Sequence, residues 1–415
     1  MFQVLKGEHE LFCRVFPLHN DDVAKSLTPF VESLGMLLLE IFRPRYIHLN
    51  NISVIANLID TLRNQEDGFS VTCQNRGMTF LLIIQRLIAD VQERLIFRAH
   101  TFIQEKVANY RPSTDDLNYP LMLVAPEVKS SSVGGEVVEL FPPVVSTLSF
   151  LGTLYRSLDG NTFSGLAEDA VLQCLMSIKK SSQIVASSAS ESDGQLFMIK
   201  YLILLREHIS PFESHLTEHF LPTRELNFSH LNGEMQRMLT GGLSVFSISP
   251  TENALVVLAT KGAPRVVEST ADCRTELEKL LRSSCEAYIM HLTRTIVGPI
   301  LGFLTKLTAF RASSPHLNAP LSRAAFATGE RLSKVVASVN NSLENDLTRM
   351  VKHMSLYITG ASTREIILNP VKNNIVEAHR QMAAVLQKYY GNIYMESLKL
   401  KTPDELAELL QRLEC

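Results

Sequence analysis

The sequence contains no tryptophan and no apolar run long enough to cross a bilayer. A membrane-spanning helix needs about 20 consecutive apolar residues. The best candidate, Leu196 to Leu205, is half that length, contains Lys200 and is followed by Arg206 and Glu207. Residues 1–13 carry charges and no apolar core, so we also expect no secretory signal. Any membrane association is therefore expected to be indirect.

Cysteine is scarce and is not arranged as a metal or disulfide framework. No two of the six cysteines form a Cys-x-x-Cys pair, although paired spacing is typical of such frameworks. We expect reduced thiols in a cytosolic protein, most of them packed as small apolar side chains. The six are Cys13, Cys73, Cys174, Cys273, Cys285 and Cys415.

The chain also lacks a surplus of positive charge. Forty Lys and Arg residues stand against 43 Asp and Glu residues, for a formal net charge of -3. The nearest basic run, Arg43-Pro-Arg45, is too short to follow a phosphate backbone. Because nucleic-acid-binding proteins usually carry a basic patch, we predict no nucleic-acid partner.

Glycine-rich phosphate loops and the Gly-x-Ser-x-Gly nucleophile motif are absent. One catalytic pattern is present, since His215-Leu-Thr-Glu-His219 matches the inverted zinc motif His-x-x-Glu-His. The pattern has only three fixed positions, and Pro211 and Pro222 leave room for a short helix only. We therefore predict no catalytic, cofactor-binding or metal-binding residues. A helical zinc hydrolase using His215, Glu218 and His219 is the weaker alternative.

What the sequence does contain is apolar residues at helical spacing through most of its length. One series steps by three and four residues and predicts a long helix near residues 77–109. Such a seam could serve a coiled-coil partner, but sustained heptads run longer, so we favour a helix facing its own bundle core. The series is Leu81, Ile84, Ile88, Val91, Leu95, Ala99 and Phe102.

Proline and glycine interrupt this pattern in residues 111–142, which contain four prolines and two adjacent glycines. Proline disrupts helix interiors, so this stretch is predicted to be a linker. The fold class that follows is all-α, an elongated rod of consecutive helical bundles. We predict bundles at residues 1–110, 143–270 and 271–415.

Local patterns add detail to the two later bundles. The serine-rich stretch from Ser181 to Ser192 is predicted to be an exposed loop, and Asp193 is predicted to cap the next helix. The Leu196–Leu205 run is apolar on all sides, so its helix should lie at the centre of a bundle. Val245 to Ser249 alternates weakly but is too short for a sheet.

The C-terminal third is predicted to form several long helices. One covers residues 271–310 and should kink at Pro299, and others lie near residues 321–356 and 362–390. The final helix has a Thr402-x-x-Glu405 capping box. The polar faces at 321–356 and 371–390 are either solvated surfaces or partner sites.

Four segments resemble subunit three of the conserved oligomeric Golgi complex. The most specific is Asp193 to Phe212, which reads DGQLFMIKYLILLREHISPF. Asp90 to His100, Leu154 to Leu166 and Asn369 to Ile375 resemble the family in the same order. The resemblance covers most of the chain and concerns the C-terminal half of family members, which are about twice as long.

The resemblance implies a non-catalytic helical rod of the type found in multisubunit tethering complexes. Family members assemble with the other subunits on the cytosolic face of the Golgi membrane, as peripheral proteins. They support retrograde intra-Golgi vesicle transport, and thereby glycosylation, through SNAREs, Rab GTPases and vesicle coat components. The family offers no catalytic or cofactor residues to transfer. A subunit of another helical-rod tether, such as one acting in exocytosis, is the alternative within this class.

Overall fold

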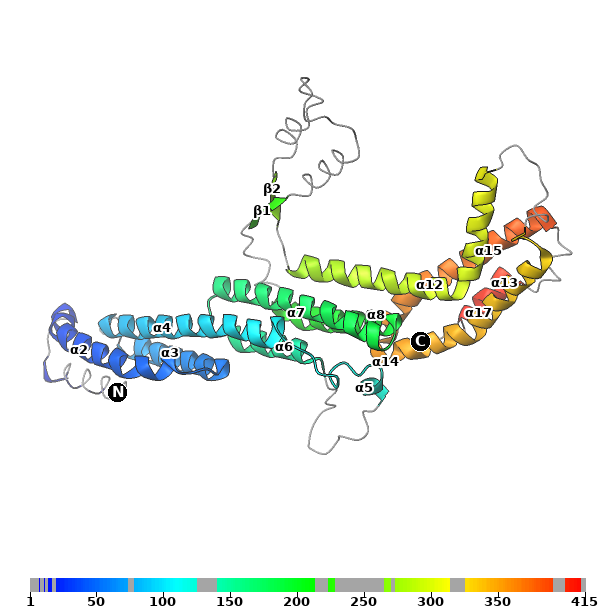
Figure 1. The fold of residues 1–415 in the computed structure, drawn as a ribbon. Helices are drawn as coiled ribbons and strands as arrows, with labels where there is room; N and C mark the ends of the chain where they lie inside the picture. Colours follow the sequence, from blue (N-terminus) through cyan, green and yellow to red (C-terminus); the bar gives the residue numbers. More distant parts are fainter. Residues whose placement is uncertain are drawn as a thin grey trace, which may run out of the picture.

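The structure is a computed structural model that describes residues 20–73, 78–124, 140–212, 223–227, 265–269, 273–313, 325–390 and 400–411, with a few residues nearer the N-terminus. Most of these residues are helical, which confirms the all-α prediction. Figure 1 shows the helices laid out along one long axis, with α2, α3 and α4 at one end and α13, α15 and α17 at the other.

The first helices are α2 (Asn20–Ile47), α3 (Ile52–Cys73) and α4 (Met78–Phe102), which continues into the π-helical turn η1 (Ile103–Ala108). Both α2 and α3 pack against α4, and η1 then packs against the next helices of the chain. The predicted seam of α4 faces this packing and is not a free partner surface. Its buried residues are Ile84, Ile88, Val91, Leu95 and Ala99.

The central helices surround α8 (Glu191–Ile209). They are α6 (Pro142–Leu154) and α7 (Gly160–Ser188), while the single turn α5 (Leu121–Val124) lies before them and η2 (Ser210–Phe212) ends the group. Helix α8 contacts α6, α7, α12 and α14, so it is covered on several sides. The prediction of a central helix is therefore confirmed. The fully buried residues of α8 are Leu196, Phe197, Ile199, Tyr201, Leu202 and Leu205.

The serine-rich stretch from Ser181 to Ser192 is not the predicted loop, because α7 continues through it to Ser188. Ser181 and Ser182 are buried. The hydroxyl of Ser182 donates to the Lys179 carbonyl at 2.8 Å, so the helix itself satisfies the serine. Small side chains here let α8 approach closely, which an exposed loop would not require.

One two-stranded ribbon departs from the helical pattern. Strand β1 (Thr223–Asn227) pairs antiparallel with β2 (Arg265–Ser269), and Thr223 lies opposite Ser269. The sequence patterns did not predict this ribbon. The weakly alternating stretch at residues 245–249 lies outside the described residues.

The C-terminal part is built around α12 (Cys273–Ser313), which packs against α8 and α15. Figure 1 shows α12 changing direction along its length, and Pro299 lies inside it, as the predicted kink requires. The helices that follow are α13 (Gly329–Asn341), the π-helical turn η4 (Ser342–Asp346), α14 (Leu347–Tyr357), α15 (Ala361–Tyr390) and α17 (Pro403–Gln411).

Helix α12 is long and apolar enough to meet the criterion for a membrane-spanning helix, with a mean hydropathy of 1.3 over its best window. The sequence patterns did not single out α12, because the run Leu196–Leu205 of α8 is more continuously apolar. Tyr288, Leu292, Ile296 and Ile300 of α12 are buried in the bundle. A core helix of a bundle meets the same criterion, and these contacts account for part of the apolar composition of α12, whose best window is 39% buried.

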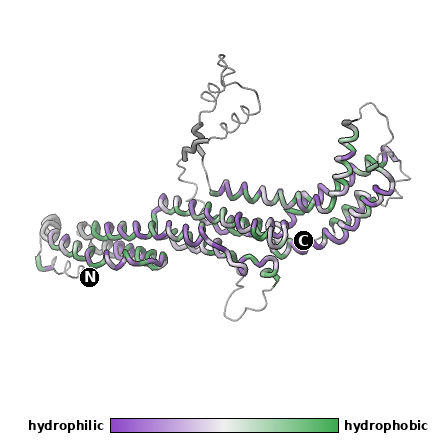
Figure 2. Tube along the Cα trace, in the orientation of Figure 1, coloured by the Kyte–Doolittle hydropathy of each residue, from purple (hydrophilic) through white to green (hydrophobic). Residues whose placement is uncertain are grey.

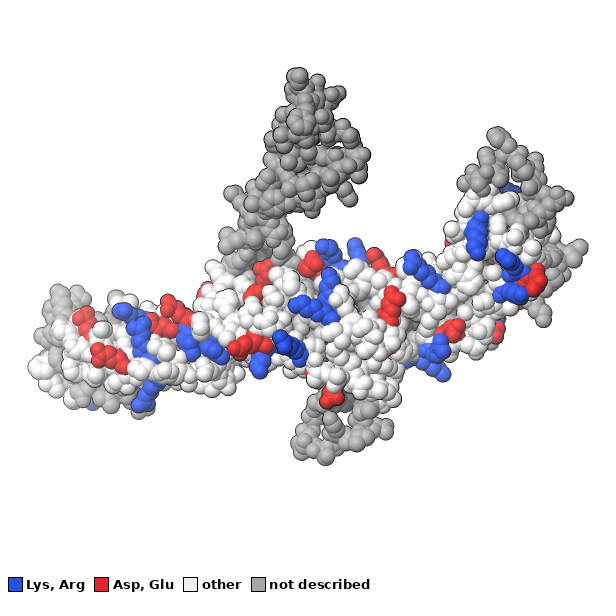
Figure 3. All heavy atoms as spheres, viewed as in Figure 1, with Lys and Arg blue, Asp and Glu red and all other residues white. Residues whose placement is uncertain are grey.

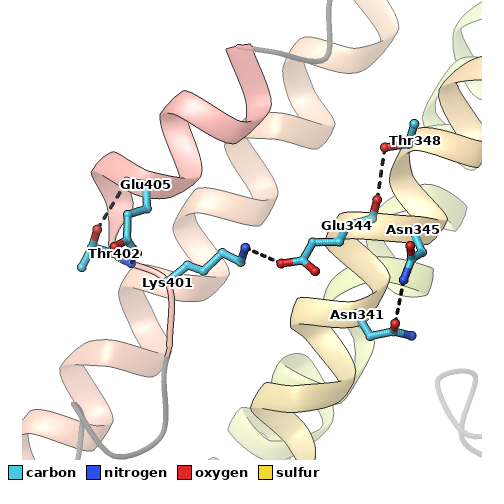
Figure 4. Close-up of polar contacts among 7 residues, drawn as sticks. All are labelled: Asn341, Glu344, Asn345, Thr348, Lys401, Thr402 and Glu405. Carbon is cyan, nitrogen blue, oxygen red and sulfur yellow. Dashed lines mark hydrogen bonds and ion pairs between the residues drawn. The ribbon is translucent and has the colours of Figure 1, made fainter.

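The last helix is held at its beginning by the predicted capping box, which the structure confirms (Figure 4). The Glu405 amide donates to Thr402 Oγ1 at 3.3 Å, and the Thr402 amide donates to Glu405 Oε2 at 2.9 Å. Lys401 Nζ lies 2.7 Å from Glu344 Oε1 of η4. Leu406 and Leu410 are buried, so α17 closes over the C-terminal bundle.

Figure 2 shows hydrophobic and hydrophilic residues alternating along the helices, as expected for amphipathic helices that share a core.

Candidate functional site

The only catalytic motif in the sequence, His215 to His219, lies outside the described residues. The nearby His208, a conceivable third ligand, is described and is exposed, with Nδ1 2.9 Å from the Leu204 carbonyl of its own helix. Within the described part of the chain, no group of three His, Cys, Asp or Glu residues could hold a metal ion. These contacts therefore do not test the zinc alternative.

Two of the described cysteines, Cys174 and Cys285, do not have the environment of a nucleophile. Burial raises the pKa of the Cys174 thiol to about 12. Burial also raises the pKa of Cys285, whereas reactive cysteines have a lowered pKa. His291, six residues along α12, has Nδ1 3.9 Å from Glu191 Oε2. Six residues separate Cys285 and His291, so their side chains lie on different sides of α12.

The most elaborate polar contacts lie around Asp193, in the segment that most resembles the family. Asp193 is not the N-cap of α8, so that prediction is wrong. Ser190 is the N-cap: its Oγ accepts from the Asp193 amide at 3.1 Å and donates to Asp193 Oδ2 at 2.6 Å. The signal was present, because a serine three residues before an acidic side chain follows the capping-box spacing.

The second carboxylate oxygen of Asp193 reaches across to α14. The Tyr357 hydroxyl donates to Asp193 Oδ1 at 2.7 Å, and His353 Nε2 lies 2.9 Å from the same oxygen. We call Ser190, Asp193, His353 and Tyr357 the Asp193 cluster. Burial and the neighbouring carboxylate raise the pKa of Tyr357, so its hydroxyl stays a neutral donor. The cluster therefore joins the beginning of α8 to the end of α14.

A pair of buried tyrosines lies next to the Asp193 cluster. The hydroxyls of Tyr119 and Tyr201 lie 2.5 Å apart, and the Phe141 amide donates to the Tyr201 hydroxyl at 3.1 Å. The ring of Tyr119 stacks on that of Tyr357, with centroids 5.9 Å apart. Burial, with the adjacent Tyr201, raises the pKa of Tyr119. The stretch before α5, the start of α6, α8 and α14 thus meet at one place.

Gly194, next to Asp193, allows α7 and α8 to pack very closely. A β-carbon built on Gly194 would lie 2.6 Å from Ala186 Cβ and 2.6 Å from the Ser182 carbonyl oxygen. Any side chain would therefore push the helices apart. The Asp-Gly pair combines a buried carboxylate with a very close helix contact.

The geometry of the Asp193 cluster supports a structural role. Each carboxylate oxygen is occupied by a donor from the protein, and the tyrosine hydroxyls are directed at these partners. A buried polar network of this kind rigidifies the elements that it joins. A carboxylate placed to act on a substrate would instead keep an accessible oxygen.

The other family-like segments also make structural contacts. Gln92 donates to the Ser157 carbonyl at 3.1 Å, linking α4 to the turn that follows α6. Asp159 caps α7 by accepting from the Thr162 amide at 3.1 Å. In the last segment, Asn374 Nδ2 donates to Thr293 Oγ1 at 3.3 Å. The sequence patterns predicted no role for Gln92 or Asn374, because their partners lie far away along the chain.

The exposed charges form no single-sign patch on the face seen in Figure 3, where acidic and basic side chains alternate. On the polar faces of the C-terminal helices, Lys334 pairs with Glu330 at 2.7 Å and Arg380 with Glu377 at 3.0 Å. Pairs of this kind within one helix are typical of solvated faces. A partner site on these faces stays a prediction.

Comparison with known proteins gives one family. The family model described as conserved oligomeric Golgi complex subunit 3, C-terminal, matches residues 1–231. A second model, the COG3 C-terminal cap domain, matches residues 280–413. No solved structure matches the chain significantly.

Curated relatives carry the same name. Conserved oligomeric Golgi complex subunit 3 of Homo sapiens is 26% identical over 464 residues, covering 99% of this chain and 55% of the relative. The Drosophila melanogaster relative is 28% identical, covering 93% of this chain and 47% of the relative. The Dictyostelium discoideum relative is 28% identical, covering 89% of this chain and 42% of the relative. The chain thus spans about half the length of the curated relatives it matches. It belongs to the family of conserved oligomeric Golgi complex subunit 3.

Proposed function

We propose that this chain acts as a non-catalytic subunit of the conserved oligomeric Golgi complex, which tethers vesicles at the Golgi. The observation that carries the proposal is the match of two family models over residues 1–231 and 280–413. The relatives are named as subunits of that complex. The work of such a subunit is to hold partners at fixed separations, which suits a stiff helical chain.

The Asp193 cluster supports this role. Asp193 and Tyr201 belong to the region that the first family model matches, whereas His353 and Tyr357 belong to the second. The contacts between them tie both regions into one unit. A scaffold that separates its partners needs such a joint, because a loose hinge would let the separation vary.

The finer features of the proposal concern place and partners. The chain would lie at the cytoplasmic face of the Golgi membrane as a peripheral protein, and in the cytosol. Besides the other subunits, its partners would include SNAREs, Rab GTPases and vesicle coat components. In this role it would support retrograde intra-Golgi transport and, through it, glycosylation and Golgi structure. The partition into bundles at residues 1–110, 143–270 and 271–415, with a linker at 111–142, is proposed as well.

Affinity purification of the tagged chain from its own cells, followed by mass spectrometry, tests the proposal. We expect the other subunits of the Golgi complex in near-equal amounts. Recovery of subunits of a plasma-membrane tether instead would favour the exocytosis alternative. Recovery of no tethering subunit at all would refute the proposed function.

The same purified chain tests the zinc alternative. Atomic emission should find no stoichiometric zinc, and His219→Ala should leave the recovery of subunits unchanged. One zinc per chain that is lost in His219→Ala would replace the scaffold proposal with a metal site at His215 and His219.

A further inference from the structure

Helix α2 has apolar side chains on two sides. One side packs on α4: Leu38 and Tyr46 are buried, and a β-carbon on Gly35 would lie within 2.1 Å of the Ile83 side chain. The other side is exposed. Phe30 is 53% exposed, Leu37 46% and Ile41 45%, so large apolar side chains face solvent there.

The three exposed residues form a regular stripe together with Leu34, which is half-buried and also packs against the core. Phe30, Leu34, Leu37 and Ile41 follow one another at steps of four, three and four residues. At about 100° per residue they share one side of the helix, roughly opposite Gly35 and Tyr46. This is the spacing with which a helix receives a second helix through interlocking side chains. We call these four residues the α2 stripe.

A membrane surface does not suit the α2 stripe. Helices that lie in the membrane interface are rich in Lys and Arg on their polar face, which attracts anionic headgroups. Helix α2 carries four acidic and three basic residues, and one of the acidic residues, Glu40, borders the stripe. Its charge therefore gives no attraction to an anionic bilayer.

The size of the α2 stripe also argues against self-association. From Phe30 to Ile41 the helix rises by about 16 Å, roughly three turns. Stable interfaces between free proteins bury about 1,200–2,000 Å² in total, more than one such stripe provides. A contact this small is sufficient when the two chains are already held together elsewhere, because the effective concentration is then high.

We propose that the α2 stripe docks one α-helix of another subunit of the tethering complex, with apolar residues at matching steps of three and four. This inference rests on the proposed function. Glu40 borders the stripe beside Ile41, so the docked helix should place a Lys or Arg next to it. The contact adds to the other subunit contacts of the chain and orients the partner along α2.

Two matched variants of the full-length tagged chain test the inference in affinity purification. Leu37→Glu/Ile41→Glu places charges in the α2 stripe. Met176→Glu/Ile184→Glu places the same charges on α7, where the two side chains are 54% and 46% exposed. We expect the stripe variant to lose about tenfold or more of one co-purified subunit, because a buried unpaired charge disrupts a docked helix. The α7 variant should recover subunits as the unchanged chain does.

The outcomes separate the inference from the proposed function. Full recovery from the stripe variant, or an equal loss from the α7 variant, overturns the α2 stripe as a docking site while the chain remains a subunit. Absence of all subunits from the unchanged chain refutes the proposed function instead. Thermal unfolding by circular dichroism checks that both variants fold.

A photo-crosslinker at Phe30 in the otherwise unchanged chain gives a second test that does not depend on the folding of a variant. A cross-link to a helix of another subunit with apolar residues at steps of three and four supports the inference. A cross-link to a second copy of this chain, or to its own residues 1–19, overturns it.

Discussion

Tyr357 donates its hydroxyl hydrogen bond to Asp193 across 164 residues of sequence, at 2.7 Å. Asp193 begins the segment that most resembles the family, and Tyr357 ends α14. The contact therefore explains why a buried carboxylate stands near the start of α8: it receives donors from a distant part of the chain.

Replacing Tyr357 by Phe should weaken the contact between α14 and α8 without disturbing the packing of the aromatic ring. Phenylalanine keeps the ring that stacks on Tyr119 but removes the donor to Asp193. Hydrogen bonds to charged groups contribute about 1.5–3 kcal/mol, so the free energy of unfolding should fall by that order. Urea unfolding measures the change. Ser283→Ala, which removes an exposed hydroxyl that donates to the Leu280 carbonyl of its own helix, is the control and should change the free energy by less than about 0.5 kcal/mol. Equal midpoints for the two variants would contradict the role of Tyr357.

Gly194→Ala should destabilise the protein although alanine favours helices. The new β-carbon would meet Ala186 and the Ser182 carbonyl, and overpacking of this kind costs about 1–3 kcal/mol. A β-carbon on Gly165, inside α7, would meet no neighbouring element within 4 Å, so Gly165→Ala should stabilise by up to about 1 kcal/mol. Thermal unfolding of the two variants should show opposite shifts. A rise for Gly194→Ala would mean that α7 and α8 can separate freely.

His379 should make stability depend on pH. Its side chain is buried in α15, Nδ1 lies 2.9 Å from the Ile375 carbonyl, and Nε2 is buried without a hydrogen bond. Burial lowers the pKa of His379, so the native state binds its proton at lower pH than the unfolded chain does. Stability is therefore complete above the unfolded value of about 6.5 and falls below it, by up to about 1.4 kcal/mol per pH unit.

The matched variants His379→Gln and His100→Gln test this dependence by urea unfolding at pH 7.5 and 5.5. Removing the buried imidazole should reduce the loss of stability between the two values. Removing the exposed His100 should leave it nearly unchanged. An identical loss in both variants would show that other groups cause the acid sensitivity.

Thr402→Ala should loosen α17 alone. It removes the acceptor of the Glu405 amide, and loss of an N-cap costs about 0.5–2 kcal/mol. Hydrogen exchange should become faster in α17 and stay unchanged in α12. Thr305→Ala, at an exposed position inside α12, is the control. Unchanged exchange in α17 would show that its apolar contacts with α15 hold it without the cap.

Periodicity and capping patterns predicted much of this fold. The seam of α4, the central position of α8 and the capping box at Thr402 all depend on residues within one helix, so a local pattern contains the information. The serine stretch at residues 181–192 misled for the opposite reason. Its serines serve close packing between α7 and α8, and that packing depends on Gly194 in the next helix.

The Asp193 cluster could not be predicted in full from the sequence. Ser190 and Asp193 follow a capping spacing, which is a local signal that the sequence contains. His353 and Tyr357 reach Asp193 only because α14 packs against α8. No local sequence pattern predicts that long-range contact. The four residues of the α2 stripe were visible in the sequence, but their exposure depends on which side of α2 meets α4.

The continuous helix formed by α4 and η1 has a mechanical consequence. Its first part is packed by α2 and α3, and its last turn by α6 and α7, so no loop separates these two sets of contacts. A force applied at the α2 end is transmitted along the hydrogen-bonded backbone of one continuous helix and not through a flexible loop. Pulling on that end should therefore displace the α6–α7 end in step, which lets the chain transmit tension as well as maintain distance.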